Sequence, residues 1–425
     1  MSDDGGSDPG PRDDRDQSRA LACPECGATV RDRWRCECGA PLEFADPPIP
    51  EGTAPDPESD RRGERDPIDP RNGLWAFESF LAVGDDPADR VTLGEGMTPL
   101  VDADAGTEGA GTEGAGTEGG GDPPDDGWNA DFKLEYVFPT GSFKDRGATT
   151  TLTRARELGV ERVVEDSSGN AGAAIATYAA RAGIDAAVYV PADVKESKLR
   201  AIRRAGAEPV RIEVSRADVT EACVAALGYG DGGETRTGDV AGSAWYASHA
   251  WNPAFFEGTA TVAYEIAFQR GWDAPDAVVT PLGHGTLFLG AYRGFRRLKR
   301  AGWIDEVPRL FGAQAAGVAP IVRELHGADA ADPEGRVNAA ADGIQIAEPV
   351  RKREILDAVA DTDGDALAVT QAAAERELDR LHAAGFYTEP TCAVAPAALR
   401  ELRERGVLAR DADVVVPLTG SGLKG

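Results

Sequence analysis

Short apolar, β-branched runs alternate with alanine-rich stretches of helical length from about residue 71 to the end of this 425-residue chain. The clearest strand-like runs are Arg162–Glu165, Ala186–Val190, Ala277–Thr280 and Val414–Leu418. The helix-like stretches among them are Gly172–Ala182, Ser197–Ala205, Thr259–Arg270 and Leu287–Ala301. This alternation predicts the α/β class, with parallel sheets that carry helices on both faces. The length suggests two or three structural units.

The first seventy residues have a different composition. Residues 1–20 are acidic, rich in Gly and Pro and without an apolar core, which predicts a disordered tail rather than a secretory signal. Residues 46–70 are rich in Pro and charge and are predicted to be a linker. Further on, a Gly-Thr-Glu-Gly-Ala repeat fills residues 106–120. It predicts a flexible surface loop over residues 104–122 with no catalytic role.

Four of the six cysteines lie in two close pairs within residues 21–45. They are Cys23-x-x-Cys26 and Cys36-x-Cys38, separated by nine residues. Four thiolates on two knuckles suit tetrahedral zinc, and a site filled by protein has no open position for catalysis. A disulfide pairing is less expected in a reducing cytoplasm. The spacing therefore favours a structural zinc ribbon over unmetallated thiols.

Acidic residues outnumber basic residues by 73 to 45, which gives a formal net charge of -28. This balance repels nucleic acid and anionic membranes, so we expect neither as a partner. No apolar run approaches the roughly 20 residues of a membrane-spanning helix, and we expect a cytoplasmic protein. Many acids with few lysines are also typical of halophilic proteins, whose carboxylates stay hydrated in concentrated salt. An ordinary acidic protein is the alternative.

One lysine lies in a segment that suits covalent chemistry. Pro139-Thr140-Gly141-Ser142-Phe143-Lys144-Asp145 follows a strand-like run, Phe132–Phe138, and Ser142 is placed to cap a helix together with Asp145. Lys144 would then lie in the first helical turn, where the positive helix end disfavours an ammonium. A neutral amine is what Schiff-base formation needs, whereas free lysine titrates at about 10.4. The alternative is a capped helix start with a solvated lysine.

Three other turns follow predicted strands and combine glycine with hydroxyl residues. Ser167-Ser168-Gly169-Asn170 offers backbone N–H groups to an anion, although helix capping alone explains it equally well. Gly283-His284-Gly285-Thr286 permits close approach to a phosphate. A dinucleotide fingerprint is a weak rival there, because the helix that follows is basic through Lys299. Thr419-Gly420-Ser421-Gly422 lies at a strand end, where α/β proteins bind ligands.

Together these segments resemble the fold-type II pyridoxal-phosphate (PLP) enzymes of the tryptophan synthase beta superfamily, and most closely the threonine synthases. Further matches, in order, are Trp34–Gly39, Leu93–Leu100, Asn252-Pro253, Glu257-Gly258, Gln314–Gly317 and Glu389-Pro390. The resemblance covers residues 20–100 and 131–425. It implies two open, mostly parallel sheets within residues 71–425, PLP as cofactor, a small amino-acid substrate and a homodimer.

The resemblance also implies residue roles. Lys144 would be the catalytic residue that holds PLP and shuttles protons. The other cofactor contacts would come from Phe143 against the ring, Asn170 at the phenolic oxygen, Gly283, His284, Gly285 and Thr286 at the phosphate, and Thr419 at the pyridine nitrogen. The substrate α-carboxylate would bind to Ser167, Ser168 and Gly169.

The resemblance breaks where threonine synthases bind the phosphate of O-phosphohomoserine. Phe255 replaces their usual arginine, other positions of that pocket hold Ala171, His249 and Ala250, and Ser421 replaces a histidine, while Lys198 remains. Three hypotheses therefore stay open. The first is a threonine synthase with another phosphate pocket, built from Lys198, His249 and Arg353. The second is ammonia loss or side-chain replacement on an unphosphorylated amino acid, and the third is a non-catalytic zinc-ribbon binding protein.

Overall fold

The computed structural model of the chain describes residues 20–31, 33–57, 68–105, 127–213, 219–227 and 244–424. Three predictions therefore lie wholly or partly outside the described residues: nearly all of the tail, residues 58–67 of the linker and most of the repeat loop. Among the described residues, none of the helices is both long enough and apolar enough to cross a membrane.

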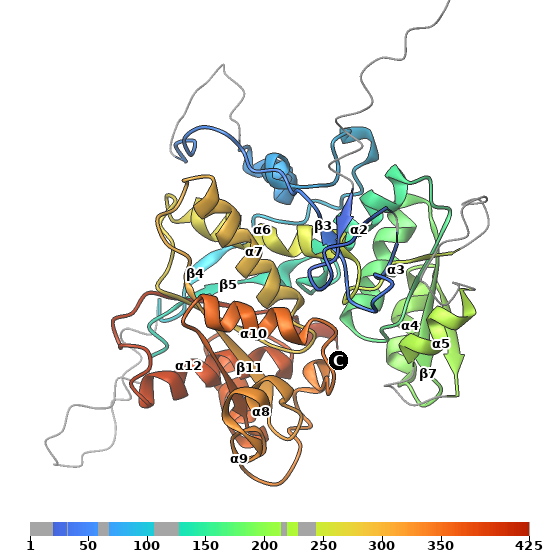
Figure 1. Cartoon of the computed structure of the whole chain (residues 1–425). Coiled ribbons are helices and arrows are strands. Elements are labelled where there is room, and N and C mark those ends of the chain that lie inside the picture. Colours follow the sequence, from blue (N-terminus) through green and yellow to red (C-terminus); the bar gives the residue numbers. More distant parts are fainter. Residues whose placement is uncertain are drawn as a thin grey trace, which may run out of the picture.

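Two mostly parallel sheets organise the chain, which confirms the predicted α/β class (Figure 1). The six-stranded sheet has the order β12 (Asp365–Val369), β11 (Arg309–Ala315), β10 (Ala277–Pro281), β13 (Val414–Pro417), β5 (Asp131–Lys133) and β4 (Leu100–Asp102), with only the β4–β5 pair antiparallel. The four-stranded sheet is parallel and has the order β8 (Glu208–Ile212), β7 (Asp185–Pro191), β6 (Arg162–Glu165) and β9 (Trp245–Tyr246). The central strands β10 and β13 are buried at every residue, as strands covered by helices should be.

Helices pack on both sheets and fill the space between them. In chain order they are α2 (Lys144–Glu157), α3 (Asn170–Ala182), α4 (Glu196–Arg204), α5 (Val219–Ala226), α6 (Pro253–Gln269), α7 (Thr286–Arg300), α8 (Pro320–His326), α9 (Ala328–Ala331), α10 (Lys352–Asp361), α11 (Gln371–Ala383) and α12 (Val394–Glu404). Figure 1 shows α3, α4 and α5 on the side of β7, and α8, α9, α10 and α12 around β11. Helix α6 is buried from Pro253 to Ala267 and packs against both α2 and α7.

A small antiparallel sheet precedes these elements. Its order is β2 (Thr29–Val30), β1 (Leu21–Ala22) and β3 (Glu43–Phe44). Short 3-10 helices connect the larger elements: η1 (Pro70–Phe80), η2 (Pro87–Asp89), η3 (Glu135–Val137), η5 (Asp342–Ile344), η6 (Pro390–Ala393) and η7 (Gly422–Lys424). The apolar side chains of the small sheet belong to the same buried core as α2 and α6. The cysteine-rich segment is therefore packed onto the rest of the chain.

Two predicted element boundaries are wrong. The strand-like run Phe132–Phe138 forms a strand only up to Lys133, because η3 turns the buried Glu135 carboxylate toward Arg146. Helix α6 begins at Pro253, ahead of the predicted Thr259. Asn252 caps it by accepting a hydrogen bond from the Ala254 N–H at 3.0 Å, and proline suits the first helical position.

A buried ionic network fixes the start of α2 to its neighbours. Arg146 donates to Glu135 at 2.6 Å and to Glu265 of α6 at 2.5 Å. Lys133 of β5 donates to Glu265 at 2.8 Å, and all four side chains have no exposed surface. Burial works against the charge of Glu265, but Arg146 and Lys133 outweigh it and lower its pKa to about 2. Two positive and two negative side chains therefore compensate one another inside the molecule.

Candidate active site

Lys144 is the first residue of α2, and the turn before it is tighter than the sequence suggested. The Ser142 hydroxyl accepts from the Lys144 N–H at 3.3 Å, but Asp145 does not complete the predicted capping box. Its carboxylate accepts instead from the Thr140 N–H at 2.8 Å and from the Thr140 hydroxyl. The reason is the turn closed by the Gly141 N–H on the Phe138 carbonyl, which brings Thr140 over the helix start.

The Lys144 amine lies between the two sheets and donates to the Thr286 hydroxyl at 2.9 Å. It lies 4.5 Å from the centre of the Phe143 ring and 5.8 Å from that of Phe255. Burial lowers the pKa of Lys144 to about 7, although nearby Glu165 and Glu389 oppose the shift. From the sequence we expected the positive helix end to favour a neutral amine. In the structure, burial is the main cause of the lowered pKa. Near neutral pH a large part of this amine is unprotonated and nucleophilic.

We expect an acylating reagent to label Lys144 of the cofactor-free folded chain with a midpoint near pH 7. In urea the midpoint should return toward 10.5, the ordinary value for lysine. Because the unfolded chain binds the extra proton between these two pH values, the contribution of Lys144 to the free energy of unfolding should rise from about pH 7 to 10.5. Mass spectrometry of the labelled peptide measures the midpoint. Equal midpoints in the folded and unfolded chains would contradict this assignment.

The glycine turn after β10 meets Lys144. Gly285 precedes α7 with a φ of 81°, and a Cβ there would lie 2.6 Å from Ile355 Cδ1, so the position requires glycine. Helix α7 has no side-chain cap at its start, and its first residue, Thr286, is the hydrogen-bond partner of Lys144. An uncapped helix start with close backbone approach suits a phosphate. The structure thus places Thr286 at the amine. The predicted turn from Gly283 to Thr286 fits the phosphate group of PLP.

The strand end after β13 closes the same site. The Phe143 N–H donates to the Thr419 carbonyl at 3.1 Å, and the Ser421 N–H donates to the Gly141 carbonyl at 2.9 Å. Thr419 is buried, with its hydroxyl 3.3 Å from the Cys392 sulfur. Burial raises the pKa of Cys392 to about 12, so it is a neutral thiol that orients Thr419. Nothing local in the sequence connects Cys392 with Thr419, which lies 27 residues further along the chain.

The predicted carboxylate-binding turn, Ser167 to Gly169, lies between β6 and α3 and is half-buried. The Asn170 amide that follows donates to Glu389 at 3.0 Å, and its oxygen accepts from Lys424 at 3.1 Å. Burial raises the pKa of Glu389, although Lys424 and Asn170 oppose the shift. The sequence indicated Glu389 only as a motif match, and it gave no signal for Lys424, which follows the Thr419–Gly422 turn.

The alternative phosphate pocket suggested by the sequence is not assembled. Lys198 is partly exposed and lies 3.4 Å from Asp342, on the side of Glu389. The Arg353 side chain is 70% exposed and pairs with Glu25 of the cysteine-rich segment. Arg353 is therefore directed toward the outer surface, and it does not join Lys198 and His249 in one pocket.

Glu165, for which the sequence predicted no role, lies near Lys144. Glu165 ends β6, and His249 follows the neighbouring strand β9. The His249 Nδ1 atom lies 2.8 Å from Glu165 Oε1, and the His249 N–H donates to Glu165 Oε2 at 3.2 Å. Burial raises the pKa of Glu165 and lowers that of His249. One feature of the sequence could have indicated Glu165: it is an acid at the last position of an apolar strand, shortly before the serine turn.

The four predicted zinc ligands come together. The Cys23 and Cys38 sulfurs are 3.5 Å apart, as are those of Cys26 and Cys36. All four sulfurs lie within 4.8 Å of one another. A tetrahedron with bonds of about 2.3 Å separates its sulfurs by about 3.8 Å. The cysteine cluster is thus compatible with a zinc ribbon.

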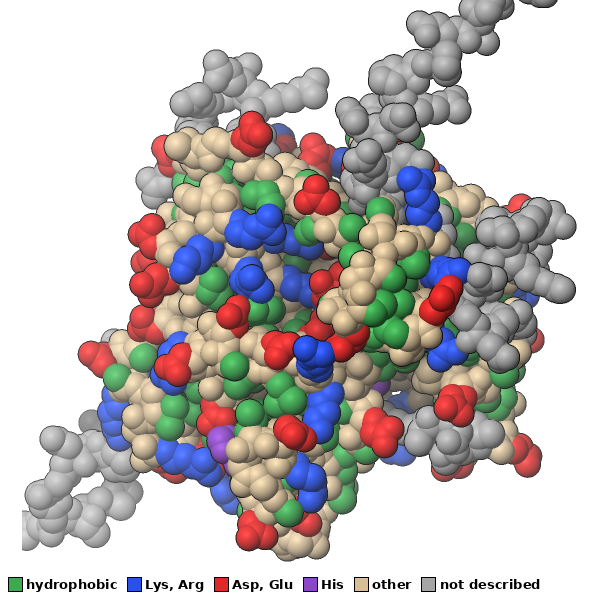
Figure 2. Space-filling view, in the orientation of Figure 1, with side chains coloured by type: hydrophobic (Ala, Val, Ile, Leu, Met, Phe, Trp, Pro, Cys, Tyr) green, Lys and Arg blue, Asp and Glu red, His purple; other side chains and the backbone are tan. Residues whose placement is uncertain are grey.

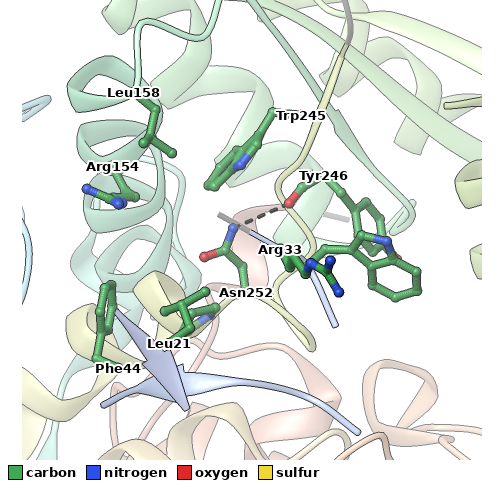
Figure 3. A pocket seen from close by; sticks show the side chains of 10 residues that line it. Leu21, Arg33, Phe44, Arg154, Leu158, Trp245, Tyr246 and Asn252 are labelled. Atoms are coloured by element: carbon green, nitrogen blue, oxygen red, sulfur yellow. Dashed lines mark hydrogen bonds between the residues drawn. The ribbon is translucent and has the colours of Figure 1, made fainter. Parts of the chain in front are cut away.

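A hollow lies where this ribbon meets the catalytic region (Figure 3). It is lined by Leu21, Arg33, Trp34, Phe44, Arg154, Leu158, Trp245, Tyr246, Asn252 and Pro253. The predicted cofactor and substrate residues do not line it. Trp34 of the ribbon packs edge-on against Tyr246 and Trp251, with ring centres 5.4 and 5.0 Å apart. The ribbon therefore supports the chain segment that carries His249.

The chain is similar to proteins named threonine synthase. That of Methanosarcina acetivorans is 35% identical over 356 residues, which are 83% of this chain and 80% of that protein. That of Methanocaldococcus jannaschii is 32% identical over 416 residues, 95% of this chain and 92% of that protein. Neither match depends on the site geometry described above.

Solved structures share the fold. Maize serine racemase superposes with a TM-score of 0.57 at 20% identity and covers 77% of this chain and 88% of its own. A PLP-dependent aspartate racemase gives 0.57 at 22% identity and covers 76% and 90%. The family model described as pyridoxal-phosphate dependent enzyme matches residues 91–420. With Lys144 and the glycine turn inside that range, the chain belongs to the family of pyridoxal-phosphate-dependent enzymes.

Proposed function

We propose that this chain is a threonine synthase-like lyase, which uses PLP on Lys144 to break a bond in the side chain of an L-amino acid. The observation that carries the proposal is the Lys144 amine, with its pKa lowered to about 7, held 2.9 Å from Thr286 at the start of α7. The likeness to two proteins named threonine synthase supports the reaction class. When bound, PLP supplies an electron sink for negative charge at the substrate α-carbon.

The residues of the chain divide the remaining tasks. The Lys144 amine takes up and releases the α-proton, since its lowered pKa suits proton transfer near neutral pH. The turn from Ser167 to Gly169 binds the substrate carboxylate. Thr419, held by Cys392, presents a neutral hydroxyl to the cofactor ring, and Asn170 is positioned by Glu389 and Lys424.

Two substrates are candidates, and the products formed from them distinguish the two. O-Phosphohomoserine, which threonine synthases convert to threonine and phosphate, is supported by the named relatives. An unphosphorylated amino acid, losing ammonia or exchanging its side-chain group, is favoured by Phe255 and the Glu165–His249 pair. Release of phosphate with threonine supports the first candidate, and 2-keto acid from serine or threonine supports the second. A purified protein without visible cofactor absorbance that turns over neither would refute the proposed function.

We also propose one structural zinc ion in the ribbon. Metal analysis should find about one zinc per chain, as a site with four thiolates requires. Cys26→Ser should reduce this to a small fraction and lower the melting temperature, because the ribbon carries Trp34, which packs on Tyr246. Cys223→Ala is the control, since Cys223 packs in one apolar cluster with Trp34 and Tyr246 but is not one of the four clustered thiols, and it should leave the zinc content unchanged. Full zinc content in Cys26→Ser would contradict the ligand set.

We propose, finally, that the enzyme works as a homodimer in the cytoplasm of a salt-rich cell. The charge of -28 supports the salt requirement, and Figure 2 shows acidic side chains spread over the visible face among basic ones. The homodimer is supported by resemblance to the family alone. Activity measured against potassium chloride tests the salt requirement, and a maximum at low salt would refute it.

A further inference from the structure

The Glu165–His249 pair forms a wall of the site and has no role in the predicted cofactor contacts. Both residues lie at the carboxyl ends of adjacent parallel strands, the edge where α/β proteins bind ligands. Glu165 has no exposed surface, while 8% of His249 is exposed. The Glu165 carboxyl group is hydrogen-bonded both to the backbone N–H of His249 and to its imidazole Nδ1, which fixes the residue in place. An imidazole that is held in one position can discriminate between substrates at no cost in conformational entropy.

The pair lies beside His284 of the cofactor turn and beside Phe255, the ring next to the Lys144 amine. The centre of the His249 ring lies 5.2 Å from that of His284 and 6.0 Å from that of Phe255. Phe255 in turn lies 5.8 Å from the Lys144 amine. A Cβ on Gly147 would approach the Phe255 ring to 2.3 Å, so α2 holds this ring tightly in place. Phe255 and His249 thus form one continuous surface next to Lys144.

The charges around this surface are unsuited to a second phosphate group. Asp166 adds another carboxylate at the same strand end, and one oxygen of it lies within 4.8 Å of a ligand atom of both Glu165 and His249. Asp166 accepts hydrogen bonds from Tyr246 at 2.9 Å and from Ser248 at 3.1 Å. A phosphate dianion beside Phe255 would therefore meet a phenyl ring and two acids, and a buried anion without partners is costly.

The cations of the neighbourhood are engaged elsewhere. Arg351 donates to the backbone carbonyls of Leu42, Ala250 and Trp251. Lys198 lies against Asp342, and Lys424 donates to Asn170. Moving Arg351 would leave those buried carbonyls without a donor, whereas the contacts of Lys198 and Lys424 are exposed to solvent. Without such a rearrangement, a second anion finds little compensation beyond the cofactor turn.

We propose that the Glu165–His249 pair and Phe255 determine specificity at the far end of the substrate subsite, which accepts an amino acid with an uncharged hydroxyl side chain rather than a phosphorylated one. The inference rests on the proposed function and selects its substrate class. A neutral imidazole both donates and accepts hydrogen bonds, which suits a hydroxyl group. Phe255, which has no exposed surface, packs behind the imidazole and makes this end of the subsite apolar.

Calorimetric titration of the holoenzyme with two unreactive ligands tests the proposal. One is L-2-amino-5-phosphonopentanoate and the other its hydroxyl counterpart, L-2-amino-5-hydroxypentanoate. We expect the hydroxyl ligand to bind at least about tenfold more tightly. Tighter binding of the phosphonate would overturn this inference and leave the proposed PLP chemistry intact. Absence of visible cofactor absorbance would instead refute the proposed function.

A substitution then assigns the preference to the pair. Glu165→Gln keeps the size of the side chain and removes its acid, so the preference for the hydroxyl ligand should narrow about tenfold. Glu161→Gln is the matched control, since it makes the same change at the exposed residue before the start of the same strand and should change the ratio by less than about twofold. Equal effects of the two substitutions would overturn the assignment to Glu165. The comparison in the unsubstituted enzyme stands even if Glu165→Gln fails to fold.

Discussion

Lys144→Ala is expected to abolish the visible absorbance of the bound cofactor and to lower kcat/KM by at least about a thousandfold. The amine is the proposed attachment point and proton carrier, and both tasks need a nucleophilic nitrogen at this position. The fold should survive, because alanine suits a helix start and the ionic network lies at Arg146 rather than at Lys144. Absorbance spectra and steady-state assays measure both effects.

Lys195→Ala is the control for removal of a lysine. Lys195 is exposed and precedes α4, so its loss should change neither absorbance nor kcat/KM. If Lys144→Ala retained the activity of this control, Lys144 could not carry the chemistry. If both variants lost activity, the effect would not be specific to the site.

Glu265→Ala is expected to lower the free energy of unfolding by about 3–5 kcal/mol, because it leaves Arg146 and Lys133 buried without one of their carboxylate partners. The network joins β5, α2 and α6, so the loss should also loosen the helix start that carries Lys144. Urea denaturation followed by circular dichroism measures the change. We further expect the cofactor to be bound more weakly in this variant.

Glu208→Ala is the comparison for an exposed pair. Glu208 pairs with Arg162 at 2.8 Å, and both side chains are about half exposed or more. Solvent weakens such pairs, so this substitution should change the stability little. A small effect of Glu265→Ala, similar to that of Glu208→Ala, would contradict the role assigned to the buried network.

Local patterns in the sequence predicted most of the elements that carry the site. The period of apolar residues located β6 and β10 because central parallel strands are apolar on both faces. Glycines located the turns between strand and helix, including Gly285, whose left-handed backbone forbids other residues. The spacing of the cysteines predicted the four sulfurs that now lie together. Each of these signals is contained in a short stretch of chain.

What the sequence could not predict depends on pairs distant in the chain. Glu165 and His249 are 84 residues apart, and Asn170 and Glu389 are 219 apart. Their contacts arise only once the strand order is known, because neighbouring strands β6 and β9 are separated by two other strands in sequence. The cause of the lowered pKa of Lys144 is likewise burial between two sheets, a property of the tertiary structure. A short sequence motif cannot predict this burial.

Borohydride reduction of the purified holoenzyme, followed by peptide mass mapping, identifies the lysine that holds PLP. Reduction fixes PLP to whichever amine holds it. We expect one pyridoxyl label, on the peptide that contains Lys144. A label on Lys133 or Lys198, or none on any lysine, would contradict this expectation.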